Sequence, residues 1–214
     1  SIPDCAAAVR DAAALLDGLG HHVEEASPRF AVREVMEAWT VVIACGLASA
    51  IRARCAKRRR PLADGEIEPM AASALRWAET FSGADYLDAV ERVHAFGRAV
   101  APFFETHDAL LSATMAEPPA EVGRFAHDRF EDFREYRLGP RGVLPYSPFC
   151  PVYNATGQPA ASLPLWWSGD GLPIGVQIAT AFGEDSLLMG LSAEIERALP
   201  WFGRRPPAAN RFGG

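Results

Sequence analysis

The side chains that could carry chemistry in this sequence are scattered along the chain. Covalent catalysis needs a serine or cysteine beside a base, and a phosphate site needs a glycine-rich loop, but neither pattern occurs. His21 and His22 are adjacent, so on a strand they would point to opposite faces. The other histidines lack the spacing of metal ligands. We therefore expect no catalytic residue, no metal site and no cofactor in these 214 residues.

Lys57, the only lysine, lies in the basic run RARCAKRRR. A lysine that acts as a base near pH 7 must be neutral, which requires burial or nearby cations that lower its pKa from about 10.4. The run ends a predicted helix, and this position indicates exposure to solvent. No serine follows another serine, and no Gly-Gly-Ser run offers backbone N–H groups for an oxyanion hole. The sequence therefore lacks the parts of a serine–lysine catalytic centre.

Three side chains remain as candidates for the wall of a ligand pocket. Cys45 belongs to the small-residue patch ACGLASA, which either lets another element pack closely or borders a cleft. Close packing is the favoured interpretation. Asn154 and Thr156 are polar groups in a segment otherwise suited to burial. They either tie down a turn through side-chain to backbone hydrogen bonds or point into a pocket, and both interpretations stay open.

Composition excludes several classes of partner. The formal net charge of -6 and the pI near 5.4 are unfavourable for nucleic acid, whose binding proteins present a basic face. The apolar stretch at residues 41–51 is shorter than the ~20 residues that cross a bilayer, so we expect no membrane insertion. The four cysteines form no CxxC pair, which favours free thiols in a reducing compartment such as the cytoplasm.

Apolar periodicity predicts most of the elements that must position these residues. The predicted helices run from near Ser1 to Gly20, over 31–59, from Pro69 through Trp77 and Phe81, over 85–105, over 124–136 and over 184–199. The predicted strands cover 21–26 at a sheet edge, 108–115, and 161–166 and 172–180 as a hairpin around the turn SGDG. The basic tail of the helix over 31–59 favours contact with solvent over a partner or anion site.

Several stretches resemble the C-terminal half of the amidase signature family, whose members hydrolyse amides. They are DALLSATMAEPPAEVG, PFCPVYNATGQPAASLPLWWSGDGLPIGVQIATAFGEDSLL, AEIERALPW and, near the start, AAAVRDAAALLDGLGHHVEEA. The resemblance thus spans nearly the whole chain. It implies an α/β fold, with residues 1–214 forming the C-terminal portion of a single amidase domain whose mixed sheet is flanked by helices and is incomplete in this chain.

The resemblance also implies that the catalytic residues and the pocket wall lie in different halves of the family's enzymes. The family's Ser nucleophile, its second Ser in a cis peptide and its buried Lys belong to the N-terminal half, which this sequence lacks. We expect this chain to be inactive alone, and to supply sheet and one wall of a pocket for a small-molecule amide. Thr114 joins Cys45, Asn154 and Thr156 as a pocket candidate, although SAT stands here where the family often has SPT.

The expectation that this chain is the C-terminal half of an enzyme also predicts its binding partners. The chain opens without Met and already in a helical pattern, which indicates a cut. The missing N-terminal half, or another copy of the chain, is then expected to cover the open edges. The alternative is a non-catalytic binding or scaffold module that completes a pocket with another chain.

Overall fold

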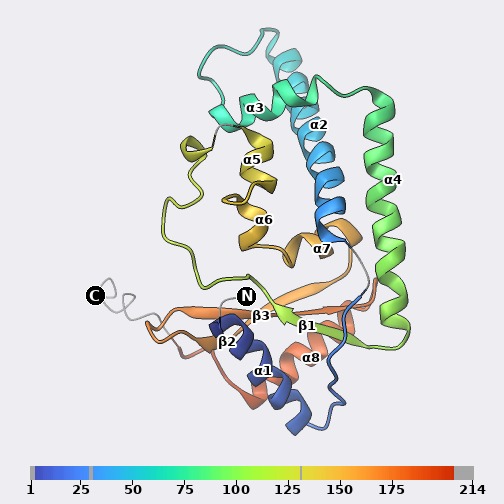
Figure 1. The fold of residues 1–214 in the computed structure, drawn as a ribbon, viewed down its shortest axis with the longest axis vertical. Helices are drawn as coiled ribbons and strands as arrows, with labels where there is room; N and C mark the ends of the chain where they lie inside the picture. The colour runs from blue at the N-terminus through green and yellow to red at the C-terminus, as the bar shows by residue number, and fades with distance from the viewer. Residues whose placement is uncertain (1–2, 29–30, 131, 205–214) are drawn as a thin grey trace. The chain divides into compact units, whose positions relative to one another are not determined.

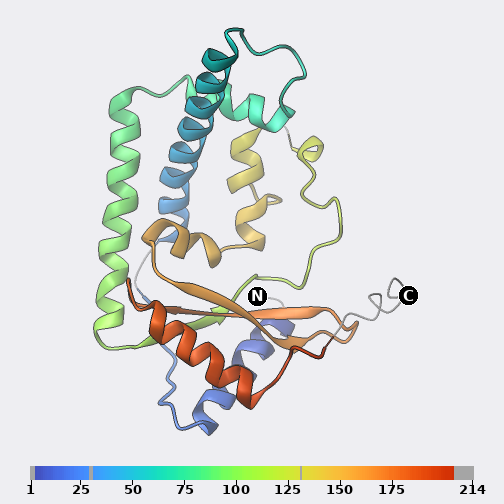
Figure 2. The same ribbon diagram turned by 180° about the vertical axis from the view of Figure 1, so that it is seen from behind.

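The structure is a computed structural model that describes residues 3–28, 31–130 and 132–204. The chain forms two compact units, each assembled from segments that are distant in sequence (Figures 1 and 2). The first unit comprises Ser1–Arg29, Ala99–Ala120 and Ser147–Gly214, and the second comprises Phe30–Arg98 and Glu121–Tyr146. The assignment of all 214 residues to one amidase domain stays a prediction.

A three-stranded antiparallel sheet forms the centre of the first unit. Its strands are β1 (Ala109–Ala113), β2 (Ala160–Trp167) and β3 (Pro173–Thr180), in the order β1-β3-β2. The predicted strand over 108–115 and the predicted hairpin are confirmed, as is the α/β class. The register of β2 shifts between Leu163 and Trp166, where Pro164 interrupts an edge strand as proline commonly does. All described pairings are antiparallel, so the described strands do not show the mixed sheet that the resemblance implies.

Helices cover both faces of this sheet. Helices α1 (Pro3–Gly18) and α8 (Asp185–Ala198) lie together against one face, and the short α7 (Cys150–Thr156) lies over the other (Figures 1 and 2). The apolar face holds the core, because alternate strand residues point toward α1 and α8. Its fully buried members include Cys5, Ala8, Val176, Ile178 and Ile195.

The second unit is helical. It consists of α2 (Val32–Arg58), α3 (Pro69–Ala78), most of α4 (Gly83–Val100), the 3-10 turn η2 (His127–Arg129), α5 (Phe133–Leu138) and α6 (Val143–Tyr146). Small side chains bring α2 close to α3, since Ala44, Ala48 and Ala74 are at most 2% exposed. Phe133 of α5 completes this core with Met70. The predicted long helix over 31–59 is confirmed.

By length and composition, α2 is the one described helix that could cross a membrane. Its apolar window extends beyond the uninterrupted stretch at 41–51 considered from the sequence. The core helix of a soluble protein meets the same criterion, and α2 packs its small residues against α3. The absence of a membrane partner stays a prediction.

Three predicted elements need correction. Residues 21–26 form no strand, because an edge strand needs a neighbour and none of the described strands pairs with them. The segment is held instead by side chains, with His21 near Glu194 at 3.2 Å. The helix predicted over 85–105 ends at Val100 and continues as the 3-10 turn η1 (Ala101–Glu105), because Pro102 has no N–H for the α-helical ladder.

The helix predicted over 124–136 is two separate pieces, η2 and α5. Asp132 starts α5 afresh, since its carboxylate accepts a hydrogen bond from the Glu135 N–H at 2.7 Å. The first backbone N–H of α5, that of Phe133, donates a hydrogen bond to the Ser73 hydroxyl of α3 at 3.1 Å. One buried serine thus joins the start of α5 to α3.

We expect Ser73→Ala to destabilise the second unit. The substitution leaves the Phe133 N–H without its acceptor in a buried position, so the free energy of unfolding should fall by about 1–3 kcal/mol. Urea unfolding followed by tryptophan fluorescence measures this change. Ser49→Ala, at an exposed position of α2, is the matched control and should change stability by less than about 0.5 kcal/mol. Equal stability of the two variants would contradict the role of the Ser73 hydroxyl.

The order β1-β3-β2 leaves one side of β1 and one side of β2 unpaired among the described strands. Unpaired edges are templates for strand addition, so we expect the isolated 214-residue chain to self-associate. Light scattering over a concentration series should give a mass that rises with concentration. A strictly monomeric and high-melting sample would contradict this expectation.

Candidate functional site

The face of the sheet opposite α1 and α8 carries polar side chains from all three strands. Ser112 of β1 and Ser162 of β2 both lie across from Gln177 of β3 in the register. Adjacent positions of the same strands, such as Val176, point to the apolar core. The first unit is therefore built on a sheet with one apolar face and one face of hydroxyl and amide groups.

Two hydroxyl groups meet on this polar face. The Oγ1 atom of Thr114, which follows β1, lies 2.6 Å from the Oγ atom of Ser162. The backbone N–H of Thr114 donates to the Gly175 carbonyl at 3.1 Å, which continues the β1–β3 pairing by one residue. A Cβ atom at Gly175 would lie 2.5 Å from the Ser162 Oγ and 2.7 Å from the Thr114 Oγ1. The hydroxyl pair therefore occupies the space that the missing side chain of Gly175 leaves.

A thiol links this pair to the buried amide of the face. The Sγ atom of Cys150, at the start of α7, lies 3.3 Å from both the Thr114 carbonyl oxygen and the Gln177 Oε1, and these two acceptors share its single S–H. Gln177 is 3% exposed, so a fixed partner for its carbonyl oxygen is needed. Burial raises the pKa of the Cys150 thiol, while a hydrogen bond with Ser147 opposes the rise. Cys150 is accordingly a neutral donor at pH 7.

Tyr153 is the second titratable group on this side of the sheet. It is 8% exposed on α7, and its burial raises the pKa of the phenol to about 12, against a lowering by a hydrogen bond with Ser112. The phenol therefore stays protonated at neutral pH. Every group placed so far on the polar face is neutral, which suits hydrogen bonding to an uncharged ligand and not the generation of a nucleophile.

Asn154 and Thr156 lie on α7 and not in a turn. Pro151 occupies the first turn of this helix and Gly157 ends it in the left-handed conformation, with φ of 75°. Asn154 is exposed, whereas the Thr156 hydroxyl donates to the Gln158 Oε1 at 2.9 Å. The Gln158 Nε2 in turn donates to the Thr180 carbonyl at 3.4 Å, so Thr156 helps to fix the segment before β2 to the end of β3. The pocket role of both residues stays a prediction.

Cys45 lies in the second unit, on α2, where it is half-buried against the core shared with α3 and α5. Burial raises the pKa of its thiol, and the Arg52 guanidinium lowers it to a smaller extent. These contacts agree with the close-packing interpretation of the small-residue patch. A pocket role for Cys45 stays a prediction, as it does for Thr114.

The structure places Lys57 in solvent at the end of α2, as the sequence indicated. Its amine therefore lacks the burial that a lysine base requires. Within residues 3–28, 31–130 and 132–204, no three His, Cys, Asp or Glu side chains gather as metal ligands.

Sequence reasoning missed most members of the polar face, namely Ser112, Cys150, Tyr153, Ser162, Gly175 and Gln177. Part of the signal was present, because the alternation of β3 already placed Gly175 and Gln177 on one face, opposite the apolar residues. The partners of Gln177 could not be found in this way, since Ser112 pairs with it from a strand distant in sequence and Cys150 contacts it from outside the sheet. Cys150 reaches the face through α7, whose short length gave no periodic signal.

Comparisons with known proteins agree on one family. Residues 2–189 match the family model described as Amidase. The 6-aminohexanoate-cyclic-dimer hydrolase of Paenarthrobacter ureafaciens is 32% identical over 211 residues, which is 97% of this chain and 43% of that relative. A solved structure of 6-aminohexanoate cyclic dimer hydrolase superposes with a TM-score of 0.89 at 32% identity, covering 98% of this chain and 44% of the other.

A more distant neighbour supports the fold alone. The structure of a bacterial aryl acylamidase of the amidase signature enzymes matches with a TM-score of 0.73 at 20% identity, over 95% of this chain and 43% of that chain. The chain thus spans less than half the length of the relatives that it matches, while nearly all of its own length is matched. On the family match and the fold together, this chain belongs to the amidase signature family.

Proposed function

We propose that this chain is the C-terminal portion of an enzyme that hydrolyses the carbon–nitrogen bond of a small-molecule amide. In this proposal the Ser-cisSer-Lys residues lie in an N-terminal portion that the chain does not contain. The observation that carries the proposal is the unequal coverage, 97% of this chain against 43% of the hydrolase from Paenarthrobacter ureafaciens. The exposed position of Lys57 supports it, because this chain offers no buried lysine of its own.

The polar face of the first unit is the part of this chain that we assign to the substrate pocket. The Thr114 and Ser162 hydroxyl groups can each donate and accept, which matches the N–H and C=O of an amide. A carboxamide substrate is neutral, and the neutral Cys150 and Tyr153 impose no charge on it. Specific recognition of a neutral amide requires such fixed donors and acceptors, because an unmatched buried polar group costs binding energy.

The substrate class follows from the named relatives. Two of them are 6-aminohexanoate-cyclic-dimer hydrolases, each 32% identical to this chain over 211 residues. We propose that the parent enzyme acts on small amides, with a cyclic amide of this kind as the first compound to assay. The four thiols are unpaired, and on this basis we propose a reducing compartment, the cytoplasm, as the location.

We expect the isolated chain to release no amine from the 6-aminohexanoate cyclic dimer or from simple aryl amides. The reason is the lack of a buried lysine base and of paired serines. Amine release measured over days, beside a blank without protein, tests the expectation. Turnover that Ser162→Ala or Ser112→Ala abolishes would place a nucleophile in this chain and would overturn the proposal. The coding sequence upstream of residue 1 should in addition encode a Gly-Gly-Ser-Ser stretch in the same frame.

Gly175→Ala should impair the parent enzyme while the fold persists. The added methyl group forces the Thr114 and Ser162 hydroxyl groups out of their positions, because both lie within 2.7 Å of it. Since a displacement of about 1 Å in substrate positioning costs up to about 100-fold in rate, we expect kcat/KM to fall by about 10- to 100-fold. The assay uses the full-length enzyme that includes the N-terminal portion.

Gly190→Ala is the matched control, because nothing lies within 4 Å of a Cβ atom at this position of α8. It should keep the parent kcat/KM. A Gly175→Ala enzyme as active as Gly190→Ala would exclude the hydroxyl pair from the substrate pocket, and would leave the family membership untouched.

A further inference from the structure

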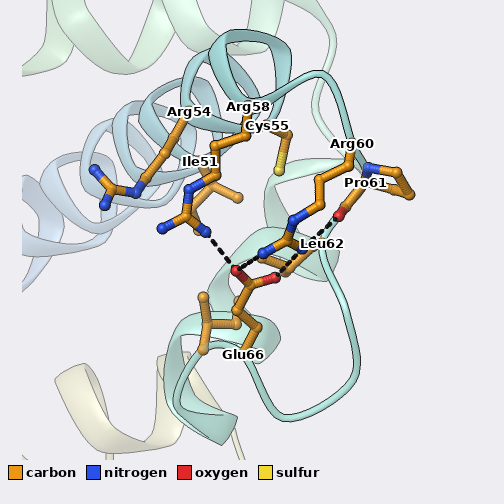
Figure 3. A pocket seen from close by; sticks show the side chains of 9 residues that line it. Ile51, Arg54, Cys55, Arg58, Arg60, Pro61, Leu62 and Glu66 are labelled. Atoms are coloured by element: carbon orange, nitrogen blue, oxygen red, sulfur yellow. Dashed lines mark hydrogen bonds and ion pairs between the residues drawn. The ribbon is translucent and has the colours of Figure 1, made fainter.

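A depression in the second unit is lined by three arginines of the basic run RARCAKRRR. It has a volume of about 240 Å³ and lies where α2 ends and the chain turns back toward α3 (Figure 3). At about 30 Å³ per water molecule, this volume holds roughly eight waters, which is the size of a small organic molecule. Arg54, Arg58 and Arg60 line the depression together with Glu66.

Glu66 fixes two of the three guanidinium groups. Its Oε1 accepts from Arg58 at 2.5 Å and from Arg60 at 2.6 Å, and its Oε2 accepts from Arg60 at 2.8 Å. The Ala63 N–H donates to the same carboxylate at 3.1 Å. The hydrogen bond from Arg60 holds the pKa of Glu66 at about 2, so the carboxylate is charged at neutral pH. Figure 3 shows the contacts of Arg58 and Arg60 converging on Glu66.

Charge and donors remain in excess after these contacts. Three cations face one anion, and a guanidinium carries five N–H donors, of which Arg58 uses one on Glu66. Arg54 has no ion pair or hydrogen bond within the described part of the chain. It stands one helical turn before Arg58, and like charges four residues apart repel on a helix. The dipole of α2 favours cations at this end but uses none of their donors.

The rest of the wall is apolar. Ile51, Leu62 and Ile67 are half-buried around the depression, together with the exposed Pro61. A small inorganic anion would leave this apolar surface in contact with water. A carboxylate on a short hydrocarbon chain would place its charge on the guanidinium groups and its chain against the aliphatic side chains.

We propose that this pocket binds a small organic carboxylate, with the carboxylate on Arg54 and Arg58 and a short hydrocarbon chain against Ile51 and Leu62. The site goes beyond the proposed amide hydrolysis and does not depend on it. Binding would reduce the repulsion between Arg54 and Arg58, because the negative charge of the ligand would lie between their two positive charges. Glu66 has the same effect between Arg58 and Arg60.

Cys55 offers a local probe, since its half-buried thiol lines the same pocket. The 214-residue chain is treated with iodoacetamide over a series of hexanoate concentrations, and modification is measured peptide by peptide by mass spectrometry. Hexanoate should slow the alkylation of Cys55 and leave that of Cys45, on the same helix, unchanged. Acetate and sulfate at equal ionic strength should protect Cys55 at least about fivefold less, since they lack the chain that the apolar wall would bury.

The variant Arg54→Gln should raise the hexanoate concentration for half protection by about fivefold or more, because a charge-assisted contact is lost at a partly exposed site. Arg76→Gln, at an exposed position of α3, makes the same change in net charge and should leave that concentration unchanged. Equal protection in the Arg54→Gln and Arg76→Gln proteins would overturn the site. Protection by sulfate equal to that by hexanoate would overturn the assignment to an organic carboxylate.

Discussion

The alternation of side chains along three strands controls what the first unit can do. Residues on one face of the sheet, such as Val176 and Ile178, are at most 1% exposed and pack against α1 and α8. Burying each of these side chains contributes about 1.5–3 kcal/mol, which fixes the register of all three strands. A shift by one residue would turn Ser112, Ser162 and Gln177 into the apolar core, where their polar groups would lose their partners. The apolar face therefore positions the polar one.

Glycine has a specific part in this arrangement. At Gly175 the strand carries no side chain, and the hydroxyl groups of Thr114 and Ser162 close over the gap from the two neighbouring strands. The Cys150 thiol then ties the same segment to the amide of Gln177. Each contact joins residues from different parts of the chain, so the polar cluster exists only when the whole sheet and α7 are folded. Local flexibility at one of these positions would disturb the others.

Sequence patterns predicted the elements whose signal lies within one segment. The long α2, the helices that begin at Pro69 and near residue 184, and the hairpin around the Gly-Asp-Gly turn all follow from local periodicity and turn residues. The prediction of a strand at 21–26 was wrong, because a strand forms only beside a neighbouring strand, and the composition of residues 21–26 does not reveal whether one is present. The prediction of one helix over 124–136 was also wrong. The stretch looks continuous in sequence, but the cap at Asp132 and the contact with Ser73 start a separate helix at Phe133. In the polar cluster, Thr114 was a pocket candidate through the family resemblance and its pocket role stays a prediction, whereas Cys150 required the tertiary structure.

The polar groups of the two units differ in charge: those in the first unit are neutral, whereas those around the depression in the second unit are charged. The polar cluster of the first unit is neutral: burial keeps Cys150 and Tyr153 protonated, and their neighbours there are hydroxyl and amide groups. Such groups can form hydrogen bonds with an uncharged ligand but cannot attack it, since attack requires a base that removes a proton. In the second unit, Arg58 and Arg60 share the carboxylate of Glu66, while Arg54 beside them has no hydrogen bond or ion pair among the residues that the structure describes. The chain has a net charge of -6, but the arginines around this depression make the local potential attractive to anions. The surrounding aliphatic side chains favour anions that carry a hydrocarbon chain.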